Sequence, residues 1–189
     1  MTISRRVLLK GAAALGLGAL ALPGAMATDF SKAIIIYYSR SGNTESIARV
    51  IAEATGAKML RIDVKEPYAE AYSDMTDIAR DEVRRKARRE LKTEIPDLSG
   101  YEMVYLGSPY WWGSLSVPVS TFLMDHNLAG KTVYPFITSG SSSPSGALSR
   151  IRELCPAATM GEHFYVPGSE ARDAGADIRA WLRKIGAVK

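Results

Sequence analysis

The chain has 189 residues, of which 47% are hydrophobic and 23% charged, and its formal net charge is +4. These are ordinary values for a globular protein, and the length suits one domain with a sizeable core. The single cysteine, Cys155, excludes an intramolecular disulfide, and two histidines without a cysteine cluster give little support to a metal site.

Residues 1–27 are predicted to be an export signal peptide. Paired arginines in "SRRVLLK" (Ser4–Lys10) precede an apolar run, "GAAALGLGALAL" (Gly11–Leu22), which is too short to span a bilayer comfortably. "AMA" (Ala25–Ala27) resembles a small-residue cleavage site. The arginine pair resembles the bacterial twin-arginine (Tat) signal, although Leu8 stands where that pattern favours phenylalanine. A Sec signal that contains two arginines is the alternative.

This signal bears on function and on charge. The twin-arginine resemblance implies export of an already folded protein to the periplasm, so that a cofactor can be inserted first, and it implies no permanent membrane anchor. The remaining domain covers residues 28–189. Loss of Arg5, Arg6 and Lys10 lowers the formal charge from +4 to +1. The basic character of the whole chain is therefore no argument for nucleic-acid binding.

Strands and helices alternate along the rest of the chain. The apolar pattern predicts strands at Lys32–Tyr38, Ala57–Val64, Glu102–Pro109, Lys131–Gly140 and Glu162–Gly168. It predicts helices at Asn43–Gly56, Val117–Asn127, Ser145–Cys155 and Asp173–Gly186. This alternation predicts an α/β fold with a mostly parallel, doubly wound sheet that is covered by helices on both faces, making three layers.

A long basic segment separates the second and third strands. Tyr68–Lys92 carries an apolar stripe at a spacing of four residues, which predicts one helix: Met75, Ala79, Val83, Ala87 and Leu91. Its other faces carry seven basic residues, which stand among Asp81, Glu82 and Glu90. We interpret these charges as a solvated face with many ion pairs, and the alternative is a docking patch for an acidic partner.

The turn after the first strand is predicted to bind a phosphate group. It follows the carboxyl end of a strand and opens a helix, where free backbone N–H groups and the helix dipole favour an anion. Ser39, Ser41 and Thr44 add hydroxyl groups, Asn43 adds an amide, and Gly42 lets the backbone approach closely. The absence of a P-loop lysine and of G-x-G-x-x-G favours a terminal phosphate monoester. The alternative is that Ser41 or Asn43 merely caps the helix.

Two later loops follow the third and fourth strands and are expected at the same edge of the sheet. The first, Ser108–Pro118, contains three consecutive large aromatic residues, Tyr110, Trp111 and Trp112. Displayed aromatic faces suggest stacking on a planar ring system, whereas the alternative places one tryptophan in the core and another on the surface. The second, Thr138–Gly146, is rich in glycine and small hydroxyl residues, a composition that is also common in plain loops.

These motifs together resemble a known family. "YSRSGNT" (Tyr38–Thr44) resembles the flavodoxin phosphate loop, and "GSPYWWGSLSVPVSTFL", "GKTVYPFITSG" and "PYAEAY" resemble a flavodoxin-like branch of small bacterial proteins. The resemblance covers about Lys32 to Gly186. It implies a five-stranded parallel sheet of order 2-1-3-4-5, with FMN bound at the switch between strands one and three.

The resemblance also implies a set of FMN-binding residues. The phosphate would be held by the loop of Ser39, Arg40, Ser41, Gly42, Asn43 and Thr44. The isoalloxazine would be flanked by Pro109, Tyr110, Trp111, Trp112 and Gly113. Its edge would be lined by Ser139, Gly140 and Ser141. Unlike the strongly acidic electron-carrier flavodoxins, this chain is near neutral without its signal, so an acidic docking face does not follow from the resemblance.

The sequence therefore predicts an FMN-binding redox protein that is exported to the periplasm. One possibility is a carrier that exchanges electrons with a redox partner protein, and another is an NAD(P)H-dependent enzyme that reduces a small quinone-like acceptor. The chain has no nicotinamide fingerprint that decides between them. A flavin-free binding module on the same fold is a third possibility. A hydrolase has less support, because the sequence contains no G-x-S-x-G motif.

Overall fold

The computed structural model describes residues 30–126, 128–140 and 143–189. The predicted signal, residues 1–27, and the predicted site residue Ser141 lie outside the described residues. None of the helices in these ranges has the length and apolar character needed to cross a bilayer.

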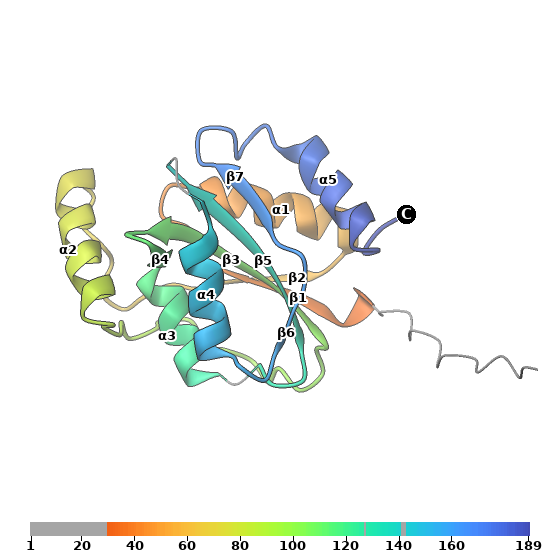
Figure 1. Cartoon of the computed structure of the whole chain (residues 1–189), viewed down its shortest axis with the longest axis horizontal. Helices are drawn as coiled ribbons and strands as arrows, with labels where there is room; N and C mark the ends of the chain where they lie inside the picture. The colour runs from red at the N-terminus through yellow and green to blue at the C-terminus, as the bar shows by residue number, and fades with distance from the viewer. Residues whose placement is uncertain (1–29, 127, 141–142) are drawn as a thin grey trace, which may run out of the picture.

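A twisted parallel sheet forms the centre of the molecule (Figure 1). Its strands are β1 (Ala33–Tyr37), β2 (Lys58–Arg61), β3 (Met103–Trp111), β5 (Thr132–Ser139), β6 (Thr159–Met160) and β7 (Phe164–Pro167). The order is β2-β1-β3-β5, with β6 and β7 both beside β5, which confirms the predicted order of five strand positions. The short β4 (Ser114–Leu115) pairs antiparallel with the end of β3.

The fifth strand position is divided, which the sequence analysis did not predict. β6 pairs with β5 up to Val133, and β7 resumes the pairing at Phe136. Pro135 lies in the gap between these two pairings, where its missing N–H removes no ladder bond to the fifth strand. Gly161 follows β6, and a Cβ there would lie 2.5 Å from the Tyr134 ring, so only glycine lets the chain cross that ring.

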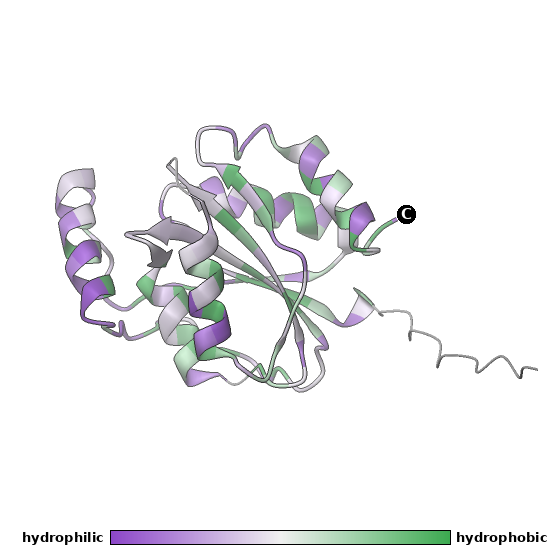
Figure 2. Cartoon of the chain, in the orientation of Figure 1, coloured by the Kyte–Doolittle hydropathy of each residue, from purple (hydrophilic) through white to green (hydrophobic). Residues whose placement is uncertain are grey.

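Helices cover both faces of the sheet. α1 (Asn43–Thr55) and α5 (Gly175–Lys184) pack on one face, and α3 (Val117–Asp125) and α4 (Ser145–Leu154) on the other (Figure 1). A short 3-10 helix, Phe30–Lys32, precedes β1. Because strand side chains alternate, Ile35 of β1 joins the core under α1 and α5, while Ile34 and Ile36 join the other core. Figure 2 shows the apolar residues concentrated on the strands and on the inner helix faces.

The helix between β2 and β3 is shorter than predicted, and it lies in an unexpected place. α2 runs only from Tyr72 to Arg84, so the prediction that Ala87 and Leu91 continue its stripe was wrong. Lys86 takes a left-handed φ of 51°, which ends the helix, and Leu91 instead forms a bridge with Val64. α2 stands beside the carboxyl end of β3 rather than over the sheet (Figure 1).

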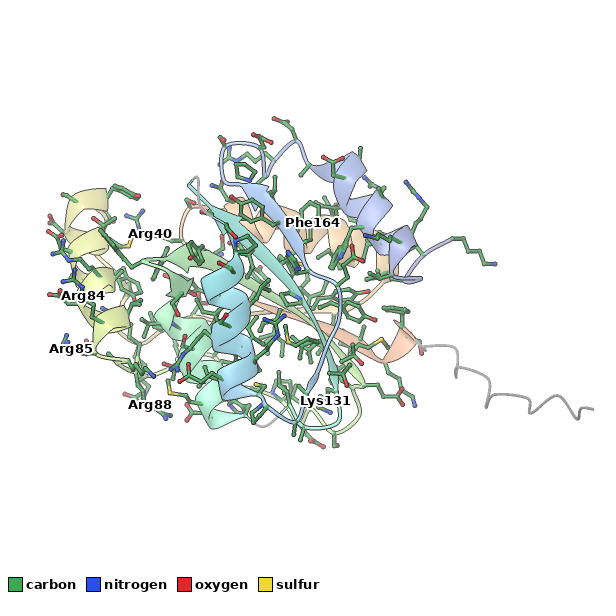
Figure 3. The ribbon with its side chains drawn as sticks, viewed as in Figure 1. Arg40, Arg84, Arg85, Arg88, Lys131 and Phe164 are labelled. Atoms are coloured by element: carbon green, nitrogen blue, oxygen red, sulfur yellow. The ribbon has the colours of Figure 1, made fainter. Side chains whose placement is uncertain are left out.

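Most of the basic residues around α2 are in ion pairs, as the sequence analysis interpreted them. Arg80 pairs with Asp77, Lys86 with Glu153, Arg88 with Asp125 and Arg89 with Glu82. The last of these is not solvated, because its side chains are only 14% and 12% exposed. Figure 3 shows Arg84 and Arg85 on the outer side of α2, where neither has an ion-pair partner among the described residues.

Candidate functional site

The turn between β1 and α1 leaves the first amides of α1 without a side-chain cap. Gly42 occupies the N-cap position with a left-handed φ of 88°, a conformation that favours glycine, and within the described chain no side chain caps the helix. The alternative in which Ser41 or Asn43 merely caps α1 is therefore wrong. Uncapped N–H groups at a helix N-terminus bind anions, because the helix dipole adds partial positive charge there.

Ser39 provides an independent sign of a ligand at this turn. Its side chain is 1% exposed, and its Oγ has no hydrogen-bond partner among the described residues. An unsatisfied buried hydroxyl costs about 1–3 kcal/mol, so such groups are rare without a purpose. The Ser39 backbone is fixed, because Arg61 Nη2 donates to its carbonyl oxygen at 2.9 Å. A hydroxyl is thus held in place with its hydrogen-bonding capacity unused.

The turn is joined to the end of β5 by two threonines. Thr44 Oγ1 and Thr138 Oγ1 are 2.9 Å apart and buried, and Ser139 follows at the end of the strand. The phosphate loop and the predicted Ser139–Gly140 edge therefore meet, as expected from the topology. Ser41 and Gly140 are both exposed, so a ligand could reach them.

Gly168 makes room for the Asn43 side chain, a role that the sequence analysis missed. A Cβ on Gly168 would lie 2.8 Å from Asn43 Nδ2, closer than real contacts allow. The Gly168 amide donates to the Ser139 carbonyl at 2.7 Å, which fixes the glycine beside the end of β5. Its position in the sequence could have indicated this role, because Gly168 directly follows the last strand, at the sheet edge where ligands bind.

Two arginines hold the phosphate loop, and only one of them was predicted. Arg40 Nη2 donates to the carbonyls of Ala69 and Glu70, at 3.2 and 2.6 Å, so its guanidinium ties the loop to the segment before α2 (Figure 3). Arg61 on β2 was not predicted, because nothing in its sequence neighbourhood connects it with Ser39. Both arginines border a cavity of about 340 Å³ beside the loop; Arg61 is ion-paired there with Glu45 and Asp63, whereas the hydrogen-bond acceptors of Arg40 are neutral carbonyls.

The predicted aromatic loop is the end of a strand and a tight hairpin. β3 does not stop at Pro109 as predicted but continues through Trp111, and β4 begins at Ser114. Trp112 and Gly113 form the turn between them with φ values of 48° and 84°. Two left-handed residues in a two-residue turn are typical of type I′ hairpins, whose twist matches that of the flanking strands.

The two tryptophans of this hairpin have different surroundings. The Trp111 ring makes edge-to-face contacts with Tyr38 and Tyr68, with centroids 5.7 and 5.0 Å apart. Trp112 is 52% exposed, and its Nε1 donates to the Thr76 carbonyl on α2 at 2.9 Å. Trp111 is thus partly buried against the core, while Trp112 lies at the surface.

A buried polar network lies beneath Trp111. Tyr68 donates to Glu82 Oε2 at 2.6 Å, and Arg89 donates to Glu82 Oε1 at 2.8 Å with its guanidinium 3.8 Å from the Tyr68 ring. Burial, and then the hydrogen bond to Glu82, raise the pKa of Tyr68. Burial also raises the pKa of Tyr38. Both hydroxyls are therefore neutral at physiological pH.

The hairpin turn and the start of α4 are in close contact. A Cβ on Gly146 would lie 1.9 Å from the Gly113 carbonyl oxygen and 3.0 Å from the Tyr110 hydroxyl. This contact brings the Pro109–Gly113 segment and the loop after β5 together, while the threonine pair joins that loop to the phosphate loop. The three predicted loops therefore converge at the carboxyl ends of β1, β3 and β5.

Comparisons with known proteins agree with this arrangement. A family model described as flavodoxin matches residues 32–185. A crystal structure of a Bacteroides eggerthii protein assigned as a flavoprotein is 30% identical, with a TM-score of 0.72 over 84% of this chain and 99% of that one. A Lactobacillus acidophilus flavoprotein solved in complex with FMN is 24% identical, with a TM-score of 0.63 over 75% of this chain and 97% of that one.

A curated relative adds an activity, over a shorter match. An NAD(P)H dehydrogenase (quinone) from Cupriavidus metallidurans is 28% identical over 93 residues, which is 49% of this chain and 45% of the relative. The chain thus spans less than half the length of this relative.

Proposed function

The chain belongs to the flavodoxin family, and from this premise we propose that it is a flavoprotein that binds FMN and transfers electrons through it. The FMN complex of the Lactobacillus acidophilus protein, which shares the fold, supports this cofactor. When bound, FMN supplies the redox chemistry, because it accepts electrons from a donor and passes them to an acceptor. The protein contributes binding, orientation and control of access.

The unused Ser39 hydroxyl beside the uncapped start of α1 is the observation that carries this proposal. A phosphate monoester has three terminal oxygens and no ring, so it suits a small cradle of hydroxyl and N–H donors. Ser39, Ser41 and Thr44 offer hydroxyls to it, and the first amides of α1 offer N–H groups. Hydrogen bonds to a charged group contribute roughly 1.5–3 kcal/mol each, so several give firm binding.

The other two loops suit a flat ring system. Tyr110, Trp111 and Trp112 present large apolar surfaces at one side of the convergence point, and Ser139 and Gly140 present small residues at the other. Edge-to-face contacts with the buried rings of Tyr38 and Tyr68 fix the orientation of Trp111 in this aromatic wall. These residues would orient the flavin ring and exclude water from one of its faces.

We infer that the electron acceptor is a small quinone-like molecule, with a redox partner protein as the second candidate. The curated quinone dehydrogenase relative supports the first, and two exposed aromatic side chains next to the hairpin, Tyr72 and Trp112, give an apolar acceptor a place to approach. The near-neutral charge predicted without the signal gives a carrier role with an acidic docking face less support. Oxidation of NADH by a soluble quinone in the presence of the purified protein alone would identify the enzyme.

We further propose that the protein reaches the periplasm through the twin-arginine route, carrying FMN that was bound before export. The arginine pair Arg5–Arg6 and the short apolar run after it support this route. In bacteria that express the chain, Arg5→Lys combined with Arg6→Lys should leave the FMN-loaded protein in the cytoplasm. Export of the variant at the normal level would contradict the route while leaving the FMN proposal intact.

The visible spectrum of the purified protein, with chromatography of any released pigment, tests the central proposal. We expect a flavin spectrum and release of FMN on denaturation. Ser41→Ala combined with Asn43→Ala should weaken FMN binding by at least tenfold, because two donors to the phosphate are lost. A colourless protein that takes up no added FMN, or a double variant with unchanged affinity, would refute the proposal and favour the flavin-free module.

A further inference from the structure

A second cavity lies where β4, α3 and α4 meet the end of α2 (Figure 1). Its volume is about 320 Å³, which is within the range of roughly 300–1,000 Å³ that small-molecule sites occupy. Of the described residues that are predicted to bind FMN, only Gly113 lines this cavity. The phosphate loop and the three large aromatic side chains of the hairpin do not contribute to its wall, so it is distinct from the site described above.

The wall of this cavity combines apolar side chains with hydroxyl groups. Leu115 and Val117 contribute buried apolar surface. Three serines, one each from β4, α3 and α4, contribute hydroxyls: Ser114, Ser120 and Ser149. This mixture is typical of sites for small organic molecules, in which apolar groups cover most of the ligand and a few polar groups fix its orientation.

Ser120 brings an unused hydroxyl to the cavity wall. The residue is only 7% exposed, and its Oγ has no hydrogen-bond partner within the described parts of the chain, although its backbone amide donates to the Ser116 carbonyl at 3.0 Å. Buried hydroxyls are normally hydrogen-bonded, because an unpaired one costs free energy. A polar ligand in the cavity would supply the missing partner.

Two cations share one carboxylate at this cavity. Lys86 Nζ lies 3.0 Å from Glu153 Oε1, and Arg150 Nη1 lies 2.7 Å from the same oxygen. The other acidic residue in the wall, Glu82, is paired with Arg89. Together these five side chains carry three positive and two negative charges, so the excess positive charge favours an anionic ligand.

Arg150 is the cation that is better placed to bind such a ligand. Its side chain is 11% exposed, whereas that of Lys86 is 68% exposed, so water screens the charge of Arg150 less. A guanidinium has five N–H donors, and contact with one oxygen atom of Glu153 leaves donors for a second carboxylate. Lys86 takes a left-handed conformation that helix ends usually assign to glycine, and its ammonium group reaches Glu153 on α4.

We propose that this cavity binds a small organic carboxylate, with its charged group at Arg150 and its apolar body against Leu115 and Val117. The inference goes beyond the proposed redox function, because it uses neither the residues that would hold the phosphate nor the aromatic wall of the flavin ring. An inorganic anion would leave the apolar surface uncovered, and an uncharged molecule would leave the excess positive charge uncompensated. A carboxylic acid with an apolar body meets both requirements.

Benzoate is the probe that tests this assignment. The full chain, in the presence of excess FMN, is titrated with benzoate and followed by amide NMR spectra. We expect saturable shifts at Ser114, Ser120 and Ser149, and none at the phosphate loop. Benzyl alcohol, which has the ring without the charge, and inorganic phosphate, which has the charge without the ring, should each bind at least tenfold more weakly.

Substitutions on α3 and α4 identify the groups that bind the probe. Arg150→Gln should weaken benzoate binding at least tenfold, because a charged donor is lost. Arg152→Gln is the matched control, since it removes the same charge from an exposed position on the same helix outside the cavity, and it should leave binding unchanged. Ser120→Ala removes a hydroxyl that has no described partner, so it should fold normally and weaken binding about threefold.

Three results would overturn the assignment: no saturable shift at the three serines, equal affinity for benzoate and either comparison compound, or equal benzoate affinity in Arg150→Gln and Arg152→Gln. If Arg150→Gln does not fold, Ser120→Ala decides, and an unchanged affinity in that variant overturns the assignment as well. Because the shifts are read at residues of the cavity, the result does not depend on whether the protein binds FMN.

Discussion

Replacing Ser39 with alanine is expected to have opposite effects on stability and on FMN binding. The Ser39 hydroxyl is buried and has no partner among the described residues, so in the flavin-free protein it is a cost of about 1–3 kcal/mol. Ser39→Ala removes that cost, and we expect the free energy of unfolding of the flavin-free protein to rise by about 1 kcal/mol, which corresponds to roughly 2–4 °C in Tm. The gain is expected near the lower end of the range of about 1–3 kcal/mol, because the substitution leaves a cavity the size of one oxygen atom, which costs part of the stability gained.

The same substitution should weaken FMN binding. If Ser39 Oγ donates to the phosphate, its loss removes a hydrogen bond to a charged group worth roughly 1.5–3 kcal/mol, which lowers the affinity about ten- to a hundredfold. Titration of the flavin-free protein with FMN, followed by flavin fluorescence, gives the affinity, and urea unfolding of the same preparation gives the stability.

Ser41→Ala is the control for this experiment, because it deletes the same atom from an exposed position in the same loop. It should weaken FMN binding and leave the stability of the flavin-free protein within about 0.5 kcal/mol of wild type. The reasoning is refuted if Ser39→Ala destabilises the flavin-free protein, since the hydroxyl would then have a partner, or if its FMN affinity equals that of wild type.

Three further predictions follow from close contacts and burial. Gly168→Ala should lower FMN affinity about tenfold by displacing the Asn43 amide. The double variant Gly168→Ala/Asn43→Ala should bind FMN no more weakly than Gly168→Ala alone, which a double-mutant cycle of FMN titrations measures. Tyr68→Phe should destabilise the protein by about 1.5–3 kcal/mol at pH 8, because the hydrogen bond to Glu82 is lost. Burial raises the pKa of Tyr68 in the folded protein, so the hydroxyl contributes its full stabilisation below the usual tyrosine pKa of about 10. Above that pH the contribution falls by about 1.4 kcal/mol per pH unit, because the unfolded chain loses the proton first. Urea unfolding should therefore show the difference in free energy of unfolding between Tyr68→Phe and wild type becoming smaller above about pH 10. Gly146→Ala should lower Tm and FMN affinity together, since its Cβ would overlap the hairpin backbone, and separate measurements in which only one changed would contradict the contact.

The sheet and four of its helices could be predicted because their apolar patterns are locally complete. β1 is a run of five buried residues, and α1 has a glycine at each end, so the hydrophobic pattern and the residues that end each element indicate the same boundaries. α2 was predicted too long because the apolar stripe, with its spacing of four residues, continues in the sequence through Leu91, whereas the chain reverses its direction after Arg85. That reversal brings Arg89 back onto Glu82 and Tyr68, a long-range contact that no local period encodes.

The turn between β1 and α1 stays a predicted phosphate site, and the residues that support it from elsewhere in the chain could not be predicted. Hydroxyl, amide and glycine residues are adjacent in the sequence of the loop, and their spacing alone predicts an anion cradle. Arg61 lies on β2 and Gly168 directly follows β7, and only the register of β1 with β2 and of β5 with β7 places them beside the loop. The hairpin at Trp112 was missed because a tryptophan in a left-handed turn contradicts the usual preference for asparagine or aspartate there.

The position of α2 follows from contacts at both of its ends. Near its first residue, Arg40 of the phosphate loop binds the carbonyls of the preceding segment, and toward its last turn Glu82 joins Tyr68 and Arg89 beneath Trp111. Arg40 thus connects the predicted phosphate loop with the start of α2, and Trp112 connects the hairpin with its middle. α2 is held by the core, through buried Met75 and Ala79, and also by polar contacts with Arg40 and Trp112, so its position depends in part on residues that would hold the cofactor.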